Sequence, residues 1–262
     1  MDKLRIFKVG GKVIEEEAVL KSFLHDFAKI EGKKMLVHGG GRTATEMSSR
    51  LNIVAQMVEG RRVTDEATLE VVTMVYGGLI NKKIVAHLQS LDVNALGLTG
   101  ADLNILRSAK RLPNPVDYGF VGDIEEVDSE AVKLLVDHDK IPVFAPLTHD
   151  KKGQLLNTNA DSIASGLAVG LASHYEVELY FCFEKKGVLA DPDDDHSVIP
   201  EIKIEDFSHL KESGVVSAGM IPKLEGAFDC IRQGVSQVNI CHYNDINELE
   251  AQSSPGTVLI KG

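Results

Sequence analysis

The chain has 262 residues, 44% of them apolar, so it can bury a large core and lies near the upper limit for one undivided core. Its formal net charge is -11 at pH 7 and no basic stripe is visible, which argues against nucleic acid as a partner. No apolar stretch approaches the ~18 residues of a membrane span, and the apolar segment after Met1 is too short for a signal peptide. We therefore expect a cytoplasmic protein with no membrane partner.

The predicted elements alternate along the chain between short strands and longer helices. Six apolar runs predict buried strands, at residues 4–9, 34–38, 93–98, 141–145, 177–182 and 237–241. Six segments carry the apolar period of helices, at residues 14–31, 42–51, 65–89, 128–138, 159–173 and 219–234. Hairpins are predicted at 53–64 and 105–122. This alternation indicates an α/β fold in which helices cover both faces of a mostly parallel sheet.

The first strand ends in the sequence KVGGK at residues 8–12, just before a predicted helix. In an open α/β sheet, ligands bind beyond the carboxyl ends of the strands, where glycines let backbone N–H groups approach a phosphate. Lys8 could reach the same phosphate. The alternative is a plain tight turn at Gly10 and Gly11 with Lys8 in solvent, and the motif alone does not decide between the two.

The second strand ends in HGGGR at residues 38–42, again before a predicted helix. Three consecutive glycines give up backbone entropy that a plain turn would not require, so a ligand-binding loop is favoured. With Ala44 and with Glu59 about twenty residues on, Gly39 and Gly41 loosely fit a dinucleotide-binding fingerprint. An esterase oxyanion loop is excluded, because the chain lacks the G-x-S-x-G pentapeptide that accompanies it.

The segment LNTNAD at residues 156–161 leads into the fifth predicted helix. Thr158 and Asp161 have the spacing of a capping box, which would serve only the start of the helix. Asn157 is left over by that interpretation, and the Asp161 carboxylate could instead orient lysines near it. Both interpretations remain open.

The segment GMIPKLEGA at residues 219–227 opens the last predicted helix. Pro222 suits a first helical turn, so Lys223 would lie at the positive end of the helix dipole. A cation is disfavoured there unless an anion binds between it and the free N–H groups. The misplaced charge therefore indicates an anion site.

Neither the cysteines nor the acidic segment DPDDD at residues 191–195 predicts a metal site. The chain has three cysteines, Cys182, Cys230 and Cys241. They lack CxxC spacing, so we expect reduced, buried thiols. A calcium loop starting at Asp191 would need Gly sixth and Glu twelfth, where His196 and Ile202 stand. The sequence thus predicts no metal held by protein side chains.

Six motifs, taken together and in chain order, resemble the amino acid kinase family. They are K-x-G-G at residues 8–11, H-G-G-G at 38–41, G-x-R-V-T at 60–64, N-x-N-A-D at 157–161, G-V-L-x-D-P at 187–192 and G-M-I-P-K at 219–223. The match covers nearly the whole chain. No G-x-x-x-x-G-K-[ST] motif occurs, so the chain is not a P-loop kinase.

The resemblance implies a three-layer αβα sandwich in a single domain, residues 1–262. Residues 1–172 would form the lobe that binds an N-acyl amino acid, and residues 173–262 the lobe that binds ATP. Members of the family are usually homodimers, and arginine-inhibited relatives carry an additional N-terminal helix before the first strand. Because this sequence starts close to its first strand, we expect an uninhibited homodimer.

The implied reaction is the ATP-dependent phosphorylation of the side-chain carboxylate of N-acetyl-L-glutamate. It gives N-acetylglutamyl 5-phosphate and ADP, a step of arginine biosynthesis. ATP would bring Mg²⁺, held mainly by its phosphates. A side-chain carboxylate with a reference pKa of ~4.3 is already ionised at neutral pH, so no general base is needed.

The resemblance also implies roles for the residues that match its motifs. Lys8 and Lys223 would stabilise the transition state, and Asp161 would hold both lysines in place. The acylated amino acid would contact Gly40, Gly41, Arg62 and Asn157, with Arg62 on its α-carboxylate. Phosphoryl and nucleotide contacts would come from Gly10, Gly11, Gly41, Glu184, Lys185, Lys186, Gly187, Val188, Leu189, Gly219 and Met220.

Two departures from the family pattern concern specificity. Phe183 and Glu184 stand where relatives commonly carry a small hydroxyl residue and Asp. Arg61 precedes the substrate arginine, where relatives usually show an aliphatic or neutral residue. Arg61 is either a solvated charge beside a turn or the partner of a second carboxylate on the acyl group. In the second case the substrate would be N-succinyl-L-glutamate.

Three other functions remain as alternatives. A kinase of the same fold could act on aspartate, glutamate, carbamate or a nucleotide monophosphate, but Arg62 and Asn157 in their contexts argue against it. A dinucleotide-dependent oxidoreductase would use the fingerprint at Gly39 and would leave Lys8 and Lys223 unexplained. A ligand sensor that does no chemistry would be expected to have lost a lysine or Asp161, and all three are present.

Overall fold

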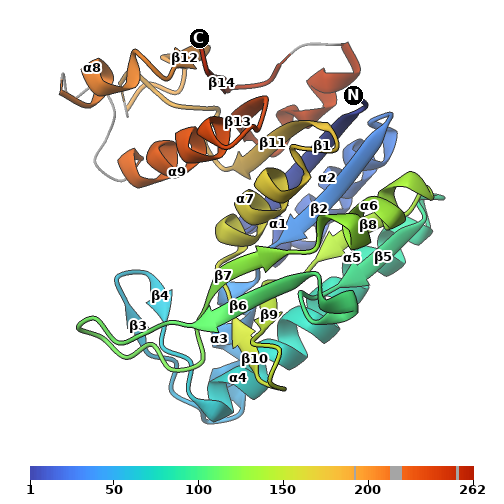
Figure 1. Ribbon diagram of the computed structural model, residues 1–262, viewed down its shortest axis with the longest axis vertical. Helices are drawn as coiled ribbons and strands as arrows, with labels where there is room; N and C mark the ends of the chain where they lie inside the picture. The colour runs from blue at the N-terminus through green and yellow to red at the C-terminus, as the bar shows by residue number, and fades with distance from the viewer. Residues whose placement is uncertain (192, 213–219, 252–253) are drawn as a thin grey trace.

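A sheet of eight strands forms the centre of the molecule, with helices on both of its faces (Figure 1). The computed structural model describes residues 1–191, 193–212, 220–251 and 254–262. Along the sheet the strands are β12 (Glu201–Lys203), β14 (Thr257–Ile260), β13 (Gln237–His242), β11 (Glu176–Phe183), β1 (Lys3–Val9), β2 (Lys33–His38), β8 (Ile141–Phe144) and β5 (Ala95–Leu98). Only β13 and β14 pair antiparallel among these neighbours. The prediction of a mostly parallel α/β sheet is confirmed.

A smaller sheet and a short hairpin lie beyond one end of the large sheet. The smaller sheet has the order β10 (Leu155–Asn157), β9 (Leu147–His149), β6 (Leu106–Lys110) and β7 (Gly122–Val127). The hairpin pairs β3 (Met57–Val58) with β4 (Arg61–Arg62), and Glu59 and Gly60 make its turn with positive φ, as hairpin turns require. Both predicted hairpins are confirmed. Three-residue strands such as β9 and β10 are too short to leave a period in the sequence.

The longer helices follow the predicted periods, with two interruptions. The helices are α1 (Lys12–Glu15), α2 (Glu17–Lys29), α3 (Gly41–Arg50), α4 (Glu66–Val72), η1 (Thr73–Ile80), α5 (Asn81–Gln89), η2 (Asp102–Asn104), α6 (Ser129–Asp137), α7 (Ala160–Leu171), α8 (Phe207–Glu212), α9 (Ile221–Arg232) and η3 (Asp245–Ala251). Of these, α8 and the short η2 and η3 were not predicted. The helix predicted at 14–31 breaks at Glu16, whose backbone is extended. The one predicted at 65–89 contains the π-helix η1. Such segments are rare and occur most often at functional sites.

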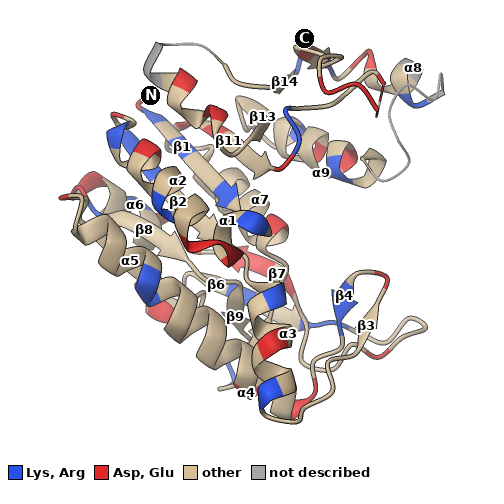
Figure 2. Cartoon of the chain, turned by 180° about the vertical axis from the view of Figure 1, so that it is seen from behind, with Lys and Arg blue, Asp and Glu red and all other residues tan. Residues whose placement is uncertain are grey.

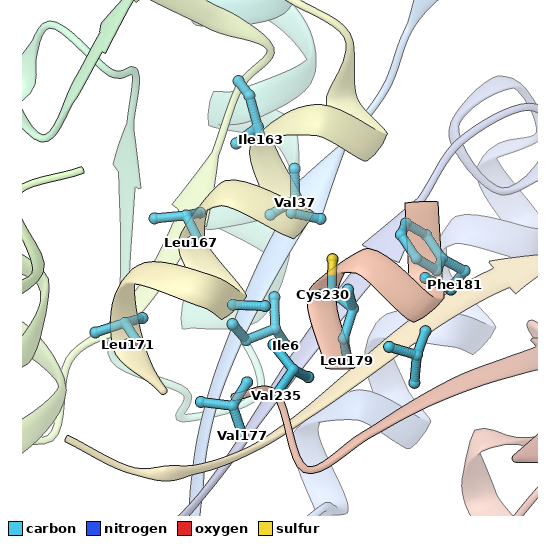
Figure 3. Close-up of a cluster of buried hydrophobic side chains, with 14 of the residues drawn as sticks. Ile6, Val37, Ile163, Leu167, Leu171, Val177, Leu179, Phe181, Cys230 and Val235 are labelled. Carbon is cyan, nitrogen blue, oxygen red and sulfur yellow. The ribbon is translucent and has the colours of Figure 1, made fainter. Parts of the chain in front are cut away.

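Alternation along the central strands separates two apolar cores. From β1, Leu4 and Ile6 face the layer that contains α7 and α9, and Phe7 and Val9 face the opposite layer. Figure 3 shows the first core, in which Ile163, Leu167 and Leu171 of α7 and Cys230 of α9 lie over strand residues such as Ile6 and Leu179. Lys8 has the same parity as Ile6, so its side chain emerges on the α7 side.

All three cysteines are buried and unbridged, as predicted. The sulfur atoms of Cys182 and Cys241 are 4.0 Å apart on neighbouring strands. Within the described ranges, no helix combines the length and the apolar character needed to cross a membrane.

Candidate functional site

Two glycine loops lie side by side at the carboxyl ends of β1 and β2. The Gly39 N–H donates to the Val9 carbonyl at 2.8 Å, and a Cβ on Gly39 would lie only 3.4 Å from the Gly10 Cα. Gly11 has φ 49°, a value that glycine adopts without strain. The parallel pairing of β1 with β2 therefore brings the two loops predicted from sequence together.

Lys8, Asp161 and Lys223 come from three different elements and gather beside these loops. The Nζ of Lys8, on β1, forms an ion pair with Asp161 Oδ1, on α7, at 2.8 Å. Lys223, in the first turn of α9, lies close enough to both residues for their charges to affect its pKa. The pKa of Lys223 is lowered from its ordinary value, chiefly by burial; Asp161 opposes this shift, and Lys8 adds to it. The site thus contains two cations around one carboxylate.

The Asp161 side chain is available to pair with Lys8, because Asn159 is the residue that caps the start of α7. Asn159 is the N-cap of α7, and its side-chain oxygen accepts hydrogen bonds from Asp161 N at 2.7 Å and Ser162 N at 3.3 Å. The Thr158 hydroxyl instead pairs with the Thr148 hydroxyl at 2.7 Å. The capping box predicted from Thr158 and Asp161 is therefore wrong, because a tertiary contact occupies the threonine.

Two cavities meet at this place. The larger, of about 850 Å³, runs between β7, α7 and α9, and Asp161, Phe183 and Lys223 line it. The smaller, of about 250 Å³, lies beside the second glycine loop and is lined by Gly40, Gly41, Arg62, Asn157 and others. Arg61, Asn159 and Ser162 border both. The four residues predicted to hold the acylated amino acid thus share one small cavity.

Arg62 is the buried cation of the smaller cavity. Its Nη2 donates to the Gly41 carbonyl and to the Thr45 hydroxyl, each at 2.7 Å. Its Nη1 is buried and has no hydrogen-bond partner. An unpaired buried guanidinium nitrogen is costly, and this nitrogen belongs to a fork that fits a carboxylate. The cavity therefore suits an anionic ligand.

Asn157 and Thr64 join the hairpin to the smaller sheet at the same cavity. The Asn157 side-chain amide donates to Thr64 Oγ1 at 3.0 Å, and its backbone N–H donates to the Phe120 carbonyl. Thr64 and Thr45 were not singled out from the sequence. Their hydroxyls become recognisable only once β4, α3 and β10 are seen to converge, although Thr64 belongs to the G-x-R-V-T motif.

The π-helix η1 packs against the second glycine loop. Gly40 has φ 153°, and a Cβ there would collide with Ile80 and lie 3.1 Å from Tyr76 Cδ1. Before the loop, His38 is fully buried, with Nδ1 2.8 Å from the Gly39 carbonyl and Nε2 3.2 Å from Asn81 Nδ2. Burial lowers the pKa of His38 to about 4. A neutral histidine and an irregular helix therefore fix the shape of the loop.

The residues expected to bind the nucleotide at 184–189 line neither cavity, and neither does Met220. Glu184 Oε1 lies 3.5 Å from where a Cβ on Gly11 would be, and Met220 is the N-cap of α9. Gly187 packs closely on Thr257, whose hydroxyl accepts from the Val188 N–H at 2.8 Å. Lys185 pairs with Asp195 at 2.9 Å, and Leu189 forms an isolated bridge with Val198. Lys186, like Lys185, Gly187, Val188 and Leu189, lines neither cavity, and Gly219 lies outside the described residues.

The positive charge at the site comes from the residues nearby and not from an extended basic surface. Figure 2 shows basic and acidic residues interspersed over the face that it presents. Among the described residues, no three His, Cys, Asp or Glu side chains gather closely enough to hold a metal ion. Because the chain as a whole is acidic, any anion that binds depends on the nearby lysines, Arg62 and the backbone N–H groups.

The fold and this arrangement of cations and glycine loops are those of a known class of phosphotransferases. The model of the amino acid kinase family matches residues 3–242, so the chain belongs to that family. Acetylglutamate kinase from Parabacteroides distasonis is 58% identical over 248 residues, which cover 95% of this chain and 97% of the relative. The enzyme of the same name from Phocaeicola vulgatus is 56% identical and covers 99% of both chains.

Solved structures show the same fold. The protein smu.665 from Streptococcus mutans superposes with a TM-score of 0.76 at 25% identity and covers 99% of each chain. Carbamate kinase from Giardia lamblia, with a TM-score of 0.74 and 14% identity, covers 100% of this chain and 99% of its own.

The dinucleotide interpretation of the glycine loop finds no support. Glu59, the acid expected on a ribose, lies in the turn between β3 and β4. In the dinucleotide fold that acid follows the second strand of a βαβ unit. Spacing alone suggested the fingerprint, and the structural context is different.

Proposed function

We propose that this protein phosphorylates the side-chain carboxylate of N-acetyl-L-glutamate with ATP, giving N-acetylglutamyl 5-phosphate and ADP in arginine biosynthesis. The observation that carries the proposal is the unpaired, buried Nη1 of Arg62 in a small cavity. Ala160 and Ser162, the chain neighbours of Asp161, line the same cavity, and Asp161 pairs with Lys8. A carboxylate of an amino acid would accept a hydrogen bond from the free Nη1 of Arg62. A phosphoryl group would bind the ammonium group of Lys8. Relatives that are more than half identical over nearly their full length carry the name acetylglutamate kinase.

The acylated amino acid would occupy the smaller cavity. Arg62 would bind the α-carboxylate through its free Nη1, because its other terminal nitrogen is already committed to Gly41 and Thr45. Asn157 and the N–H groups of Gly40 and Gly41 would hold the rest of the substrate. The side-chain carboxylate would then point toward Asp161 and its ion-pair partner Lys8.

Phosphoryl transfer needs charge stabilisation here, and no base, because the attacking carboxylate is already ionised. Lys8 and Lys223 would neutralise charge on the oxygens of the transferring group, and the N–H groups of Gly10, Gly11 and Gly41 would add hydrogen bonds. Asp161 would keep the two ammonium groups together against their mutual repulsion. It acts as an organiser of charge.

ATP would enter from the larger cavity, with Mg²⁺ coordinated by its phosphates. Met220 at the start of α9 and Glu184 beside Gly11 support this direction. The contacts proposed for Lys185, Lys186, Gly187, Val188 and Leu189 have no geometric support from the two cavities. They stay predictions, as does the one for Gly219.

The lobes, the homodimer and the cytoplasmic location also stay predictions. A boundary near residue 172 is supported by the connection there, since α7 ends at Leu171 and β11 begins at Glu176. Light scattering should give about twice the chain mass of 28.5 kDa if the protein is a homodimer. A mass near that of one chain would contradict it.

A hydroxamate-trapping assay tests the function directly, because hydroxylamine converts an acyl phosphate into a hydroxamate, which forms a coloured complex with Fe³⁺. We expect a signal with N-acetyl-L-glutamate, ATP and Mg²⁺. Aspartate, unacylated glutamate and carbamate should give none. No acyl phosphate from N-acetyl-L-glutamate would overturn the proposal.

N-Succinyl-L-glutamate belongs in the same panel, although the comparisons give no support to it as the substrate. Arg61 is exposed on β4 and borders both cavities. Its charge contributes to the lowered pKa of Asp123, after the stronger effect of Arg111. Arg61 therefore already faces a carboxylate of the protein itself.

A further inference from the structure

Phe183 is an unusual neighbour for two lysines that are meant to bind phosphate. The Lys223 Nζ lies 4.0 Å from the centroid of its ring, and the Lys8 Nζ lies 5.5 Å from it. Both distances are within the range in which a cation is attracted to the face of an aromatic ring. Phe183 also lines the larger cavity together with Asp161 and Lys223.

The strand register explains this contact. Phe181 and Phe183 are two residues apart on β11 and so point to the same face of the sheet. Lys8 on β1 is paired with Phe181 and points to that face as well. The two rings are nearly parallel, with centroids 6.2 Å apart, and Phe181 is only 6% exposed. The buried ring of Phe181 thus supports the ring of Phe183 from behind.

The two lysines differ in what holds them. Lys8 has the Asp161 carboxylate at 2.8 Å, whereas no ion pair to Lys223 is found in the described part of the chain. An ion pair would occupy ammonium hydrogens that a phosphoryl group must use. The face of a ring attracts the charge through its quadrupole and brings no carboxylate oxygen to compete with a phosphoryl group for the N–H donors.

We propose that Phe183 is a positioning residue for phosphoryl transfer, whose ring face holds the Lys223 ammonium, and at longer range that of Lys8, ready for the transferring oxygens. The inference rests on the function proposed above, but the placement of Lys223 can be measured without any activity. It deepens the mechanism because the ring replaces the small hydroxyl residue usual in the family.

The ring also helps to keep Lys223 charged. Burial and the charge of Lys8 on β1 lower the pKa of Lys223, and Asp161 on α7 opposes them. The electron-rich ring face adds to the effect of Asp161. Weakening the ring's quadrupole should therefore lower the pKa of Lys223 further and move the alkaline limb of the kcat profile to lower pH.

The main test changes the electron distribution of the ring and keeps its shape. Incorporation of 3,4,5-trifluorophenylalanine at position 183 weakens the quadrupole, and Phe183→Leu removes it. We expect kcat to fall by about 3- to 30-fold, the range that one cation–π contact supports, with the KM for ATP within twofold of the unchanged protein. Phe183→Tyr, which keeps the ring face, should retain most of kcat.

Phe207→Leu is the matched control, because Phe207 packs on Phe228 with ring centroids 5.0 Å apart and no lysine of the described residues lies over its face. It should leave kcat and its pH profile unchanged. A rise in the KM for ATP at constant kcat in the Phe183 variants would overturn the proposal and assign the ring to nucleotide binding. An unchanged kcat with the fluorinated ring would overturn it too.

NMR titration of protein labelled with [ε-¹³C]lysine separates this inference from the proposed function. The Lys223 signal is assigned by its loss in Lys223→Arg. Fluorination at position 183 should lower the pKa of Lys223 by at least about 0.5 unit. An unshifted pKa would overturn the proposal even in an active enzyme. If the wild-type protein makes no acyl phosphate, the proposed function fails while the titration still decides what Phe183 does.

Discussion

A lysine's usefulness in phosphoryl transfer depends on what surrounds its charge, and Lys8 and Lys223 show two solutions. Lys8 is paired with Asp161 and its side chain is 12% exposed, so it is fixed by an ion pair in a partly dry site. Lys223 is held by the start of α9 and by an aromatic face. We expect neither lysine to be needed for folding, because neither belongs to the apolar cores.

Replacement of either lysine by alanine should therefore abolish most of the activity and leave the fold intact. For Lys8→Ala and Lys223→Ala we expect kcat to fall by at least ~100-fold, which is typical of losing one preorganised charge. Steady-state kinetics measure the loss, and thermal unfolding checks the fold. Lys21→Ala, which removes an exposed helix lysine paired with Glu17, is the control. Near-normal turnover in both site variants would exclude the proposed roles.

Arg62 should act on substrate binding more than on the chemical step. Arg62→Gln should raise the KM for N-acetyl-L-glutamate by about 10- to 100-fold, the size of a lost charge-assisted hydrogen bond. The KM for ATP should change less than about twofold, because in the proposed mode the Arg62 side chain contacts the amino acid and not the nucleotide. Arg42→Gln, at an arginine that is 70% exposed, serves as control. Equal rises in both constants would count against a substrate contact.

At the scale of elements, the second glycine loop depends on the π-helix beneath it. Tyr76 and Ile80 of η1 lie directly against Gly40. The loop is thereby shaped by a helix that is distant in sequence. A side chain at position 40 has neither the space nor the backbone angles that it needs.

Gly40→Ala should cost about 1–3 kcal/mol of stability through strain and overlap, and it should move the loop away from the phosphoryl position. We expect a loss of kcat/KM of at least ~10-fold, because a displaced oxyanion donor is ineffective. Gly78→Ala, where an added Cβ meets nothing within 4 Å, is the matched control from η1 itself. If both substitutions have the same effect, the packing argument fails.

At the scale of the whole molecule, stability should depend on the protonation of buried His38. Burial lowers its pKa to about 4, from an ordinary value of 6.5. The unfolded chain therefore binds a proton at pH values where the folded chain does not. Folding loses free energy as the pH falls from 6.5 toward 4, by up to about 3 kcal/mol, and the loss levels off below that.

Urea unfolding at several pH values measures this dependence. His38→Gln should lose less stability between pH 6.5 and 4.5 than the wild-type protein does, because glutamine does not titrate. His25→Gln, at an exposed histidine, should keep the full wild-type slope. Identical slopes for wild type and His38→Gln would show that His38 does not titrate with a lowered pKa.

Local patterns in the sequence predicted much of the secondary structure and several residues of the candidate site. Strand and helix periods predicted the central strands, because each buries a run of apolar residues against both layers. The glycine loops and Lys223 were found because their chemistry is unusual for the turn or helix start in which they stand, and the family resemblance added the role of Asp161. The buried cysteines followed from their spacing and apolar surroundings.

Tertiary structure decided the rest, because those features depend on residues far apart in the chain. Asn159, and not Thr158, caps α7, since Thr148 from β9 engages the Thr158 hydroxyl. The small sheet and the π-helix leave no distinct period in the sequence. The unpaired nitrogen of Arg62 and the ring of Phe183 over two lysines exist only after separate elements converge. The sequence thus predicted which groups gather at the candidate site, while packing decided what holds each of them in place.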